Sequence, residues 1–394
     1  MTKISIHQTQ GQEMLDVLYS LNQYSLHPSP PYENREEWNA IASCRKGVTC
    51  FTAYKNEKPV SVAVSTAMTQ NIRGKLYPAS GVWGVSTDPA VRREGYCRQT
   101  IAALLHAEIE SGKVFSNLYP FRESFYERMG YIAFPLEKVA RFTTSSLSPL
   151  LKLKLDGEIE LKLIGDVFDI YRDYLKKMRE HQHGMGVFDE GDHTAAKRNR
   201  FWVAIARING KVEGLMIYRI TGEEVTKYNF VAIRFYYQSS QARYLMLNWI
   251  ARHIDQSNRA EIWLPAFENP ELWYADLEVK VETAIRPSMT RILDVKKIGG
   301  MTVGKGNFSA KIIDPLCTWN EGFWKFESIQ GSLQVSKTTK ADFDLKIQGL
   351  SALIAGTRDP QDFQIVGWGN PNPNLQAVMQ EMFPPAIPYL HENF

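Results

Sequence analysis

Hydrophobic and polar residues in the first part of the chain follow two different periods. Alternation predicts strands, and recurrence every three to four residues predicts helices. The predicted strands are 49–54, 59–65, 82–85 and 114–119, with one or two closing strands in 131–142. The predicted helices are 15–24, 35–42, 101–109 and a short one in 121–131. This order predicts a mixed α and β domain with antiparallel strands before a central helix.

The middle of the chain repeats this pattern in weaker form. Two strand-like runs flank the turn Asn209-Gly210, which is a hairpin signal. The predicted elements are strands 201–206, 212–218, 226–237 and 261–264 and a helix in 239–254. The polar segment Thr143–Pro149 predicts a linker before this second domain.

The last part of the chain predicts a third domain after Pro287. Residues 289–294 open it, and 331–336 and 343–347 alternate as strands do. Residues 350–356 and 375–383 predict two helices, the second of which ends at Phe383-Pro-Pro.

Composition narrows the class of protein. The chain has 394 residues, of which 44% are hydrophobic and 23% charged, and its net charge is +3. So small a net charge gives no support for a nucleic-acid partner. No apolar run approaches the roughly 18 residues of a membrane span, and the N-terminus lacks the apolar stretch of a signal peptide. The four cysteines, at 44, 50, 97 and 317, show no Cys-x-x-Cys spacing. We therefore expect a cytoplasmic protein without disulfides, a metal or a membrane partner.

Residues 82–100 carry the most informative chemistry. They predict a strand, a turn and an arginine-bearing loop that opens a helix. A helix N-terminus presents unpaired amides to an anion, and Gly95 lets the backbone approach one closely. Arg92, Arg93 and Arg98 add positive charge. The loop therefore predicts a phosphate or pyrophosphate site, although its sequence is neither Gly-x-Gly-x-x-Gly nor a P-loop.

The segment Arg92-Arg93-Glu94-Gly95-Tyr96-Cys97 resembles the Arg/Gln-x-x-Gly-x-Gly/Ala loop of GNAT N-acetyltransferases, which holds the pyrophosphate of acetyl-CoA. Cys97 replaces the usual Gly or Ala. For the loop alone, a basic helix start on a solvated face is the alternative. The following helix, strand and short helix keep the family's order, and Tyr126 matches the tyrosine that often protonates the departing thiolate. The alternative for Tyr126 is a core tyrosine, the role we expect for Tyr131.

Over nearly its full length the chain resembles the Eis (enhanced intracellular survival) type of acetyltransferase. This resemblance implies an α+β fold with a catalytic GNAT domain (1–145), a degenerate GNAT-like domain (146–287) and a sterol-carrier-protein-like domain (288–394). It also implies a homo-oligomer, a hexamer in relatives. The loop 237–242 lacks the Arg/Gln-x-x-Gly signature, so we expect no CoA in the second domain. A lipid-binding carrier with a vestigial GNAT domain and an acetyl-CoA sensor are competing functions.

The chain's last residue, Phe394, has a family role as well. In Eis-like enzymes the free carboxylate of a terminal phenylalanine is the general base, although such a carboxylate has an intrinsic pKa of only about 3.3–3.7. A disordered tail is the alternative, but the apolar residues Ile387, Tyr389 and Leu390 favour docking. Asn393 is neutral where some relatives carry an acid, which puts an aminoglycoside preference in doubt.

Two other groups of polar residues carry weaker hypotheses. His181 and His183 lack further ligands for a metal at suitable spacing. Glu392 could attract a cationic acceptor, and so could an acidic cluster, although a solvated loop is the usual role of such a cluster. The cluster consists of Asp189, Glu190 and Asp192.

The resemblance implies transfer of acetyl from acetyl-CoA, the co-substrate, to a primary amine by direct attack. The acceptor would be an aminoglycoside-like molecule, a polyamine or a lysine, in a small molecule or peptide. Tyr126 would be the acid and Phe394 the base. The expected cofactor-binding residues are Val85, Ser86, Thr87, Arg93, Glu94, Gly95, Tyr96, Cys97, Arg98, Phe121 and Arg122.

Overall fold

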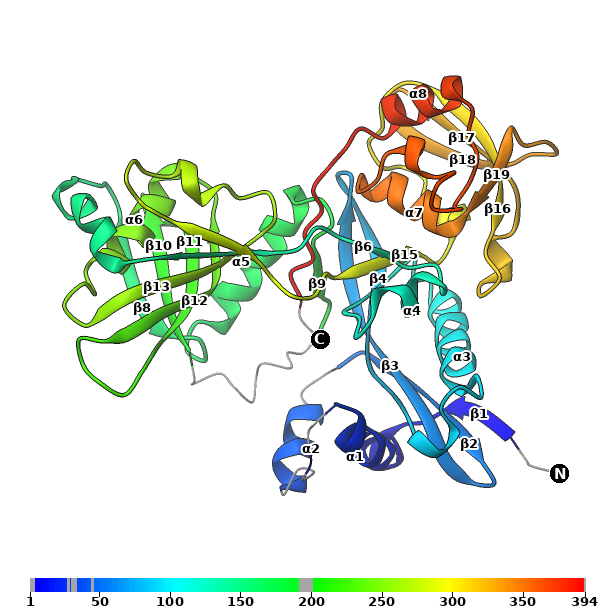
Figure 1. Cartoon of the computed structure of the whole chain (residues 1–394), viewed down its shortest axis with the longest axis horizontal. Helices are drawn as coiled ribbons and strands as arrows, with labels where there is room; N and C mark the ends of the chain where they lie inside the picture. Colours follow the sequence, from blue (N-terminus) through cyan, green and yellow to red (C-terminus); the bar gives the residue numbers. More distant parts are fainter. Residues whose placement is uncertain (1–3, 27–28, 30–33, 44–45, 191–200, 393–394) are drawn as a thin grey trace. The chain divides into compact units, whose positions relative to one another are not determined.

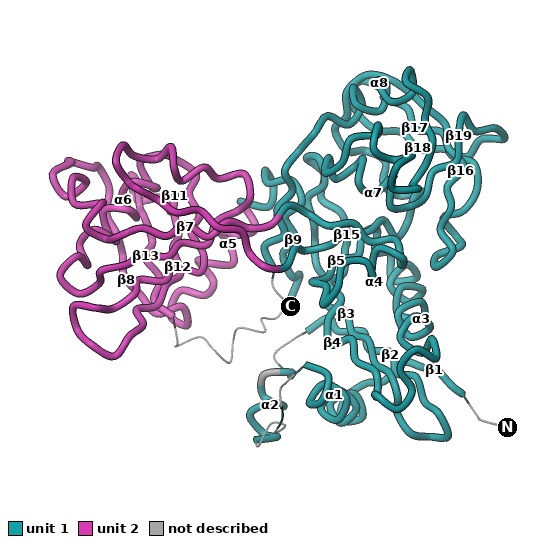
Figure 2. Tube along the Cα trace, in the orientation of Figure 1, with its two compact units in different colours: residues 1–135, 178–193, 286–394 teal, residues 136–177, 194–285 magenta. Residues whose placement is uncertain are grey.

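The computed structural model describes residues 4–26, 29, 34–43, 46–190 and 201–392 (Figure 1). These residues form two compact units (Figure 2). The first unit combines residues 1–135, 178–193 and 286–394, and the second combines 136–177 and 194–285. Each unit is therefore assembled from stretches that are far apart in the sequence. None of the helices in the described ranges is long and apolar enough to cross a membrane.

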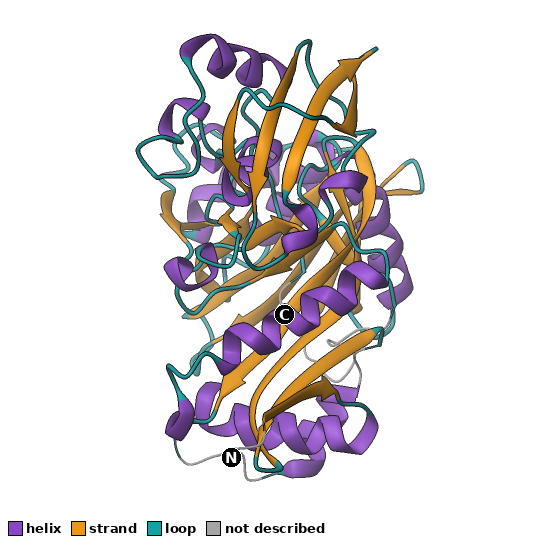
Figure 3. Ribbon diagram, turned by 90° about the vertical axis from the view of Figure 1, so that its right-hand side faces the viewer, coloured by secondary structure: helices purple, strands orange, loops and turns teal. Residues whose placement is uncertain are grey.

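The first unit contains a sheet with the strand order β1-β2-β3-β4-β5-β15-β6, and β9 pairs with β3. The strands are β1 (Ile4–Gln8), β2 (Val48–Lys55), β3 (Lys58–Ile72), β4 (Lys75–Thr87), β5 (Phe115–Leu118), β6 (Ile132–Ala133), β9 (Gly186–Phe188) and β15 (Met289–Ile292). Only β4 and β5 pair in parallel, and the helix α3 (Tyr96–Glu110) connects them. This helix crosses β2, β3 and β4 on one face, as the turned view shows (Figure 3).

The remaining helices of the N-terminal part are α1 (Gly11–Leu26), α2 (Arg35–Ser43) and the short α4 (Glu123–Glu127). Their apolar positions recur at helical spacing, and α1 buries Val17, Leu18 and Leu21. These three side chains pack against Val62 and Val64 of β3. The helices predicted from the sequence over this part are therefore confirmed, with ends that differ by a few residues.

The C-terminal part of the first unit is a four-stranded sheet with two helices. The strand order is β18-β17-β16-β19. The elements are β16 (Asn307–Ile313), β17 (Gly322–Ile329), β18 (Ser332–Lys337), β19 (Phe343–Lys346), α7 (Ile347–Ala355) and α8 (Pro373–Met382). Its core is continuous with that of the N-terminal sheet, because Tyr77 and Phe115 belong to the same cluster as Phe326 and Leu353.

The second unit repeats the topology of the N-terminal sheet. Its strand order is β14-β7-β13-β12-β11-β10-β8. The elements are β7 (Lys138–Phe142), β8 (Glu158–Leu163), β10 (Trp202–Ile208), β11 (Lys211–Thr221), β12 (Tyr228–Tyr237), α6 (Ser240–Ala251), β13 (Ser257–Leu264) and β14 (Lys280–Thr283). The helix α5 (Phe168–His181) belongs to the second unit up to residue 177, and its last residues belong to the first unit. Again only one pair, β12 and β13, is parallel, and α6 connects it. The predicted second GNAT-like domain is therefore confirmed.

Two strands pair differently from the sequence prediction. Residues 131–142 were expected to close the first domain, but only β6 does so, and β7 pairs with β13 and β14 of the second unit. Residues 289–294 were expected to open the last domain, but β15 pairs with β5 and β6 in the first sheet. Each sheet therefore fills the place beside its parallel pair with a strand from another part of the chain. Periodicity identifies strands but does not reveal their partners.

The prediction of a linker at Thr143–Pro149 is also wrong, because this segment packs on the core of the second unit. These residues lie in a 3₁₀ helix, Thr144–Lys152, whose Leu147 and Leu150 are fully buried. Both side chains join the core cluster that contains Leu247 and Ile250 of α6. Serine, threonine and proline favour a loop locally, but the two leucines three residues apart dock the segment on the core.

Candidate active site

The loop between β4 and α3 leaves the N-terminus of α3 without a side-chain cap. Asp88 accepts a hydrogen bond from the Ala90 amide (3.0 Å) and fixes the turn that follows β4. Arg93 and Gly95 then adopt positive φ angles of 71° and 89°. Gly95 is the N-cap residue of α3 and has no side chain to bond the first amides. These amides have no acceptor within the helix, so they can bind an anion.

A pocket of ≈ 570 Å³ adjoins this helix end. Its lining residues are Ser25, Leu26, Val85, Ser86, Thr87, Val91, Arg92, Arg93, Gly95, Tyr96, Cys97, Arg98, Phe121 and Phe125. The lining therefore combines three arginines at the helix end with two phenylalanines. It includes all of the expected cofactor-binding residues except Glu94 and Arg122.

Glu94 and Arg122 are not among the lining residues, and their expected contact with a cofactor stays a prediction. The Glu94 carboxylate pairs with Lys55 (Oε2 to Nζ 2.9 Å), so its negative charge is engaged outside the pocket lining. Arg122 is the N-cap residue of α4, and its carbonyl accepts a hydrogen bond from the Phe125 amide (3.2 Å). Sequence reasoning did not find Ser25 and Leu26, because α1 reaches the pocket only through the tertiary fold.

Tyr126 lies in α4, and its side chain is only 4% exposed. Its ring packs edge-on against Phe121 and Phe125, with centroids 5.8 and 5.1 Å away. Burial raises the pKa of Tyr126 well above its usual value, and the nearby Cys97 and Tyr131 add to this shift. Within the described ranges its hydroxyl has no hydrogen-bond partner. Tyr126 is therefore a protonated acid beside two residues of the pocket wall.

Cys97 occupies the second position of α3 and also lines the pocket. Burial raises the pKa of its thiol to about 11, although a hydrogen bond with Thr87 acts in the opposite direction. The thiol is therefore neutral at physiological pH. A small neutral side chain leaves the anion site at the helix end intact.

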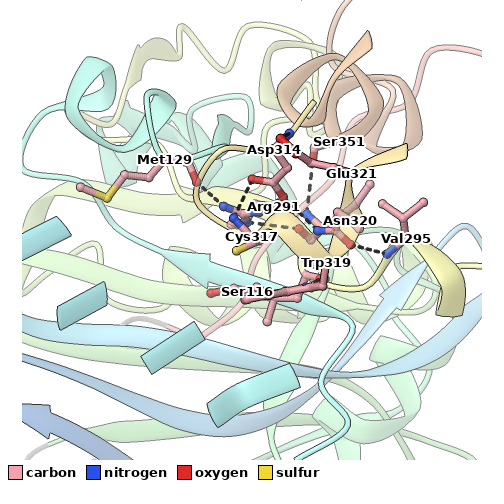
Figure 4. Close-up of polar contacts among 12 residues, drawn as sticks. Ser116, Met129, Arg291, Val295, Asp314, Cys317, Trp319, Asn320, Glu321 and Ser351 are labelled. Carbon is pink, nitrogen blue, oxygen red and sulfur yellow. Dashed lines mark hydrogen bonds and ion pairs between the residues drawn. The ribbon is translucent and has the colours of Figure 1, made fainter. Parts of the chain in front are cut away.

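Behind Tyr126, the chain reverses at Gly130, which has a φ angle of 90°. A Cβ atom there would lie 2.8 Å from Nη1 of Arg291 and from Cγ2 of Ile347. The fully buried Arg291 donates to the carbonyl of Met129 and pairs with the carboxylate of Asp314 (Figure 4). An arginine between Thr290 and Ile292 in a short strand was the sequence signal for this contact, and sequence reasoning missed it.

The segment that precedes the chain's end is docked on the first unit. The Tyr389 amide donates to the carbonyl of His183 (3.0 Å), and the Tyr119 hydroxyl donates to the carbonyl of Leu390 (3.4 Å). Glu392 is 6% exposed and accepts a hydrogen bond from the Phe188 amide (3.0 Å). Asn393 and Phe394 lie outside the described residues, so the expected role of Phe394 stays a prediction.

The residues of the weaker hypotheses have other partners. The Glu392 carboxylate binds a backbone amide, and Asp189 accepts from the Thr69 hydroxyl and lies 3.9 Å from the Lys113 ammonium. Glu190 is exposed, and Asp192 lies outside the described residues. His183 bonds the Arg73 amide and the Ala355 carbonyl, whereas His181 is exposed. In the part of the chain that the structure describes, no group of three or more His, Cys, Asp or Glu side chains could hold a metal ion.

The corresponding helix of the second unit, α6, is closed to an anion. Its N-cap, Ser239, uses its side chain to accept a hydrogen bond from the Ala242 amide (3.3 Å). The Ser239 hydroxyl in turn donates to the carboxylate of Glu213 (2.6 Å). A carboxylate beside the helix start repels a phosphate. An anion site therefore fits α3 and does not fit α6.

Two family models match parts of the chain. Residues 6–133 match the acetyltransferase (GNAT) domain, and residues 300–391 match the sterol carrier protein domain. Comparison with curated proteins finds no match. GNAT domains use acetyl-CoA as a co-substrate and act on small-molecule or peptide amines.

Solved structures match over the whole chain. A GCN5-related N-acetyltransferase from Anabaena variabilis is 16% identical, with a TM-score of 0.82 over 98% of this chain and 99% of that chain. A probable N-acyltransferase from Enterococcus faecalis is 21% identical, with a TM-score of 0.83 over 100% of both chains. Eis1 from Mycobacterium abscessus is 14% identical, with a TM-score of 0.76 over 100% of both chains. At these identities the likeness shows a shared fold over the whole chain.

Proposed function

We propose that this chain, an N-acetyltransferase with an N-terminal GNAT domain and an Eis-like fold, binds acetyl-CoA at α3 and acetylates a primary amine by direct attack. One observation carries the proposal. The uncapped N-terminus of α3, with Arg92, Arg93 and Arg98 around it, shares a pocket wall with the aromatic residues that enclose Tyr126. The proposed anion site therefore lies in a pocket whose wall residues Phe121 and Phe125 pack against the proposed acid, Tyr126.

The pocket residues fit the two ends of acetyl-CoA. The first amides of α3 and the arginines would hold the pyrophosphate. The pairing of β4 with β5 ends at Val82 and Leu118. Within the described structure no strand pairs with β4 on that side beyond Val82, so the backbone at Val85–Thr87 would bond the pantetheine amides there.

Acetyl-CoA would supply the acetyl thioester that the amine attacks. Tyr126 would donate its hydroxyl proton to the departing sulfur, since a tyrosine hydroxyl is protonated at neutral pH and a thiolate leaving group needs a proton. The carboxylate of Phe394 would take a proton from the acceptor amine, since an ammonium group has no lone pair for attack. The contacts of Tyr389, Leu390 and Glu392 fix the path of the chain as far as Glu392, two residues before Phe394.

The acceptor we propose is an aminoglycoside-like molecule, a polyamine or a lysine side chain, and the assembly we propose is a homo-oligomer. A screen of these three amine classes, with release of the CoA thiol as the readout, tests the acceptor. Titration calorimetry with acetyl-CoA tests the pocket. Micromolar binding supports the enzyme, whereas no binding together with co-purified lipid would favour the carrier.

The proposed acid is tested by Tyr126→Phe. We expect kcat to fall by about 100-fold, a typical loss for a general acid, while the Kd for acetyl-CoA changes little. Tyr218→Phe, at a buried tyrosine of the second unit, is the matched control and should keep full activity. An unchanged kcat in Tyr126→Phe would exclude the acid role.

The proposed base is tested by adding two glycines after Phe394. The extension moves the terminal carboxylate but leaves the phenylalanine side chain in the sequence. We expect kcat to fall and acetyl-CoA binding to persist. Full activity of the extended chain would rule out the terminal carboxylate.

A further inference from the structure

The helix that carries Tyr126 has too few internal hydrogen bonds to hold its own position. With five residues, α4 is far shorter than the roughly 12–15 residues at which isolated helices become even marginal. Its end is closed by tight turns, in which the Met129 amide donates to the Tyr126 carbonyl (2.9 Å) and the Gly130 amide donates to the Glu127 carbonyl (2.9 Å). Further support for this helix has to come from outside it.

That support comes from residues far along the chain. Nε2 of Gln348, in the first turn of α7, donates to the carbonyl of Glu127 (2.7 Å). Nε1 of Trp368 donates to the carboxylate of the same glutamate (3.2 Å). Both donors belong to the C-terminal domain, and both bind the residue that directly follows Tyr126.

A third donor fixes the next turn. Arg291, on β15, donates to the carbonyl of Met129 (Figure 4). Asp314 holds this guanidinium, and both side chains are at most 1% exposed. Asn320 donates to Asp314 in turn (Nδ2 to Oδ2 2.9 Å). Because every member of this network is bonded, the end of α4 rests on a rigid support.

We propose that the C-terminal domain positions the general acid, with Gln348 and Trp368 as positioning residues that act through Tyr126. This inference rests on the proposed function of Tyr126. Neither residue is among those that line the pocket, and both bind the residue after Tyr126. Gln348 would fix the backbone carbonyl of Glu127 and Trp368 its carboxylate, and together they would hold the turn of α4 that carries the Tyr126 ring. A displacement of about 1 Å at such a group costs roughly 100-fold in rate.

A double-mutant cycle tests this proposal. Gln348→Met removes the donor but keeps an unbranched side chain of similar length. We expect kcat to fall about tenfold, as for a lost hydrogen bond of about 1.4 kcal/mol, with the KM for acetyl-CoA within twofold. In the Tyr126→Phe background the same substitution should lower kcat no further. If Gln348→Met does not fold, Glu127→Gln, which keeps the side-chain length but weakens the bond from Nε1 of Trp368, should lower kcat in the same way.

The matched control is Tyr77→Phe. The Tyr77 hydroxyl also donates from the N-terminal sheet to a backbone carbonyl at the start of the C-terminal part, Ile298 (2.7 Å), and does not contact α4. We expect Tyr77→Phe to lower thermal stability but to keep kcat. Equal losses of kcat in Tyr77→Phe and Gln348→Met would overturn the inference. A further tenfold loss of kcat when Gln348→Met is added to Tyr126→Phe would also overturn it. A normal kcat in Tyr126→Phe alone would instead overturn the proposed function.

Discussion

At the residue scale, His183 shows how burial fixes a protonation state. Its Nδ1 accepts a hydrogen bond from the Arg73 amide (3.0 Å), so Nε2 carries the proton and donates to the Ala355 carbonyl (3.0 Å). Burial lowers the pKa of His183 to about 4, and the charge of Arg73 acts in the same direction. A neutral imidazole therefore joins the β3–β4 hairpin to the end of α7.

This histidine predicts a loss of stability in mild acid. The unfolded chain binds the proton below about pH 6.5, whereas the folded chain binds it only near pH 4. The stabilisation is therefore complete above pH 6.5 and is lost as the pH falls through this window. Through this group alone, we expect the free energy of unfolding to fall by about 2 kcal/mol between about pH 7 and pH 5.

Urea unfolding at both pH values measures this effect. His183→Gln should lower stability at pH 7 but show a smaller further loss at pH 5. His181→Gln, at an exposed histidine two residues earlier, should keep the wild-type dependence. An undiminished pH dependence in His183→Gln would assign the acid sensitivity to other groups.

Gly130 and Gly112 form a matched pair at the same scale. Their φ angles are 90° and 88°, so alanine is strained equally at both positions. A Cβ atom at Gly112 meets nothing within 4 Å, whereas at Gly130 it meets Arg291 and Ile347 at 2.8 Å. We expect Gly112→Ala to cost about 1 kcal/mol of stability and Gly130→Ala about 3 kcal/mol or more. Equal costs in denaturant unfolding would show that the Arg291 network yields easily.

At the element scale, the two central helices differ in what occupies their N-termini. The N-cap of α3 is Gly95, which leaves the first amides of the helix free of a side-chain bond. The N-cap of α6 is Ser239, whose hydroxyl bonds the Ala242 amide and also the carboxylate of Glu213. Both helices connect a parallel pair of strands in the same topology. The capacity to bind an anion therefore depends on a few residues at the helix start and not on the fold.

Arg98 tests the anion site at this scale. It lies in the first turn of α3 and lines the pocket. We expect Arg98→Ala to raise the KM for acetyl-CoA by about tenfold, the cost of one charge-assisted contact, with little change in kcat. The effect should shrink at high salt. Lys176→Ala, at an exposed lysine of the second unit, is the control. A lower kcat at unchanged KM would contradict a binding role.

How far the sequence predicts these elements depends on whether their signals are local. Gly95 and the arginines indicate an anion site because loop, helix start and charge lie within a few residues. The pairings of β7 and β15 escaped prediction, because their partners lie more than a hundred residues away. The role of Gln348 escaped prediction for the same reason, since its partner Glu127 lies 221 residues earlier in the sequence.

At the scale of the whole molecule, the N-terminal sheet of the first unit cannot be separated from the C-terminal part of the chain. β15 supplies the strand between β5 and β6, although it follows β5 by 170 residues or more. The core cluster that includes Met68 and Phe115 also includes Ile312 and Leu353 of the C-terminal domain. The GNAT domain of this chain therefore depends on residues beyond its own continuous segment.

This dependence predicts the behaviour of a shortened chain. A chain that ends at Ile285 keeps the loop proposed to bind acetyl-CoA and Tyr126 but lacks β15, Arg291 and α7. It leaves an edge of β5 unpaired and exposes the apolar face that contains Tyr77 and Phe115. We expect this chain to aggregate or to unfold without a cooperative transition, and to lose acetyl-CoA binding.

Calorimetric titration and circular dichroism measure both effects. The matched control is a chain that keeps residues 286–394 but replaces Ile285, whose side chain is 95% exposed, by serine. It should bind acetyl-CoA and unfold as the wild type does. If the chain that ends at Ile285 bound acetyl-CoA with unchanged affinity, the N-terminal domain would be autonomous, and β15 would add stability without completing the fold. The loss of binding that we expect would instead make the C-terminal domain a structural requirement of the catalytic domain, because it completes the sheet on which α3 and α4 rest.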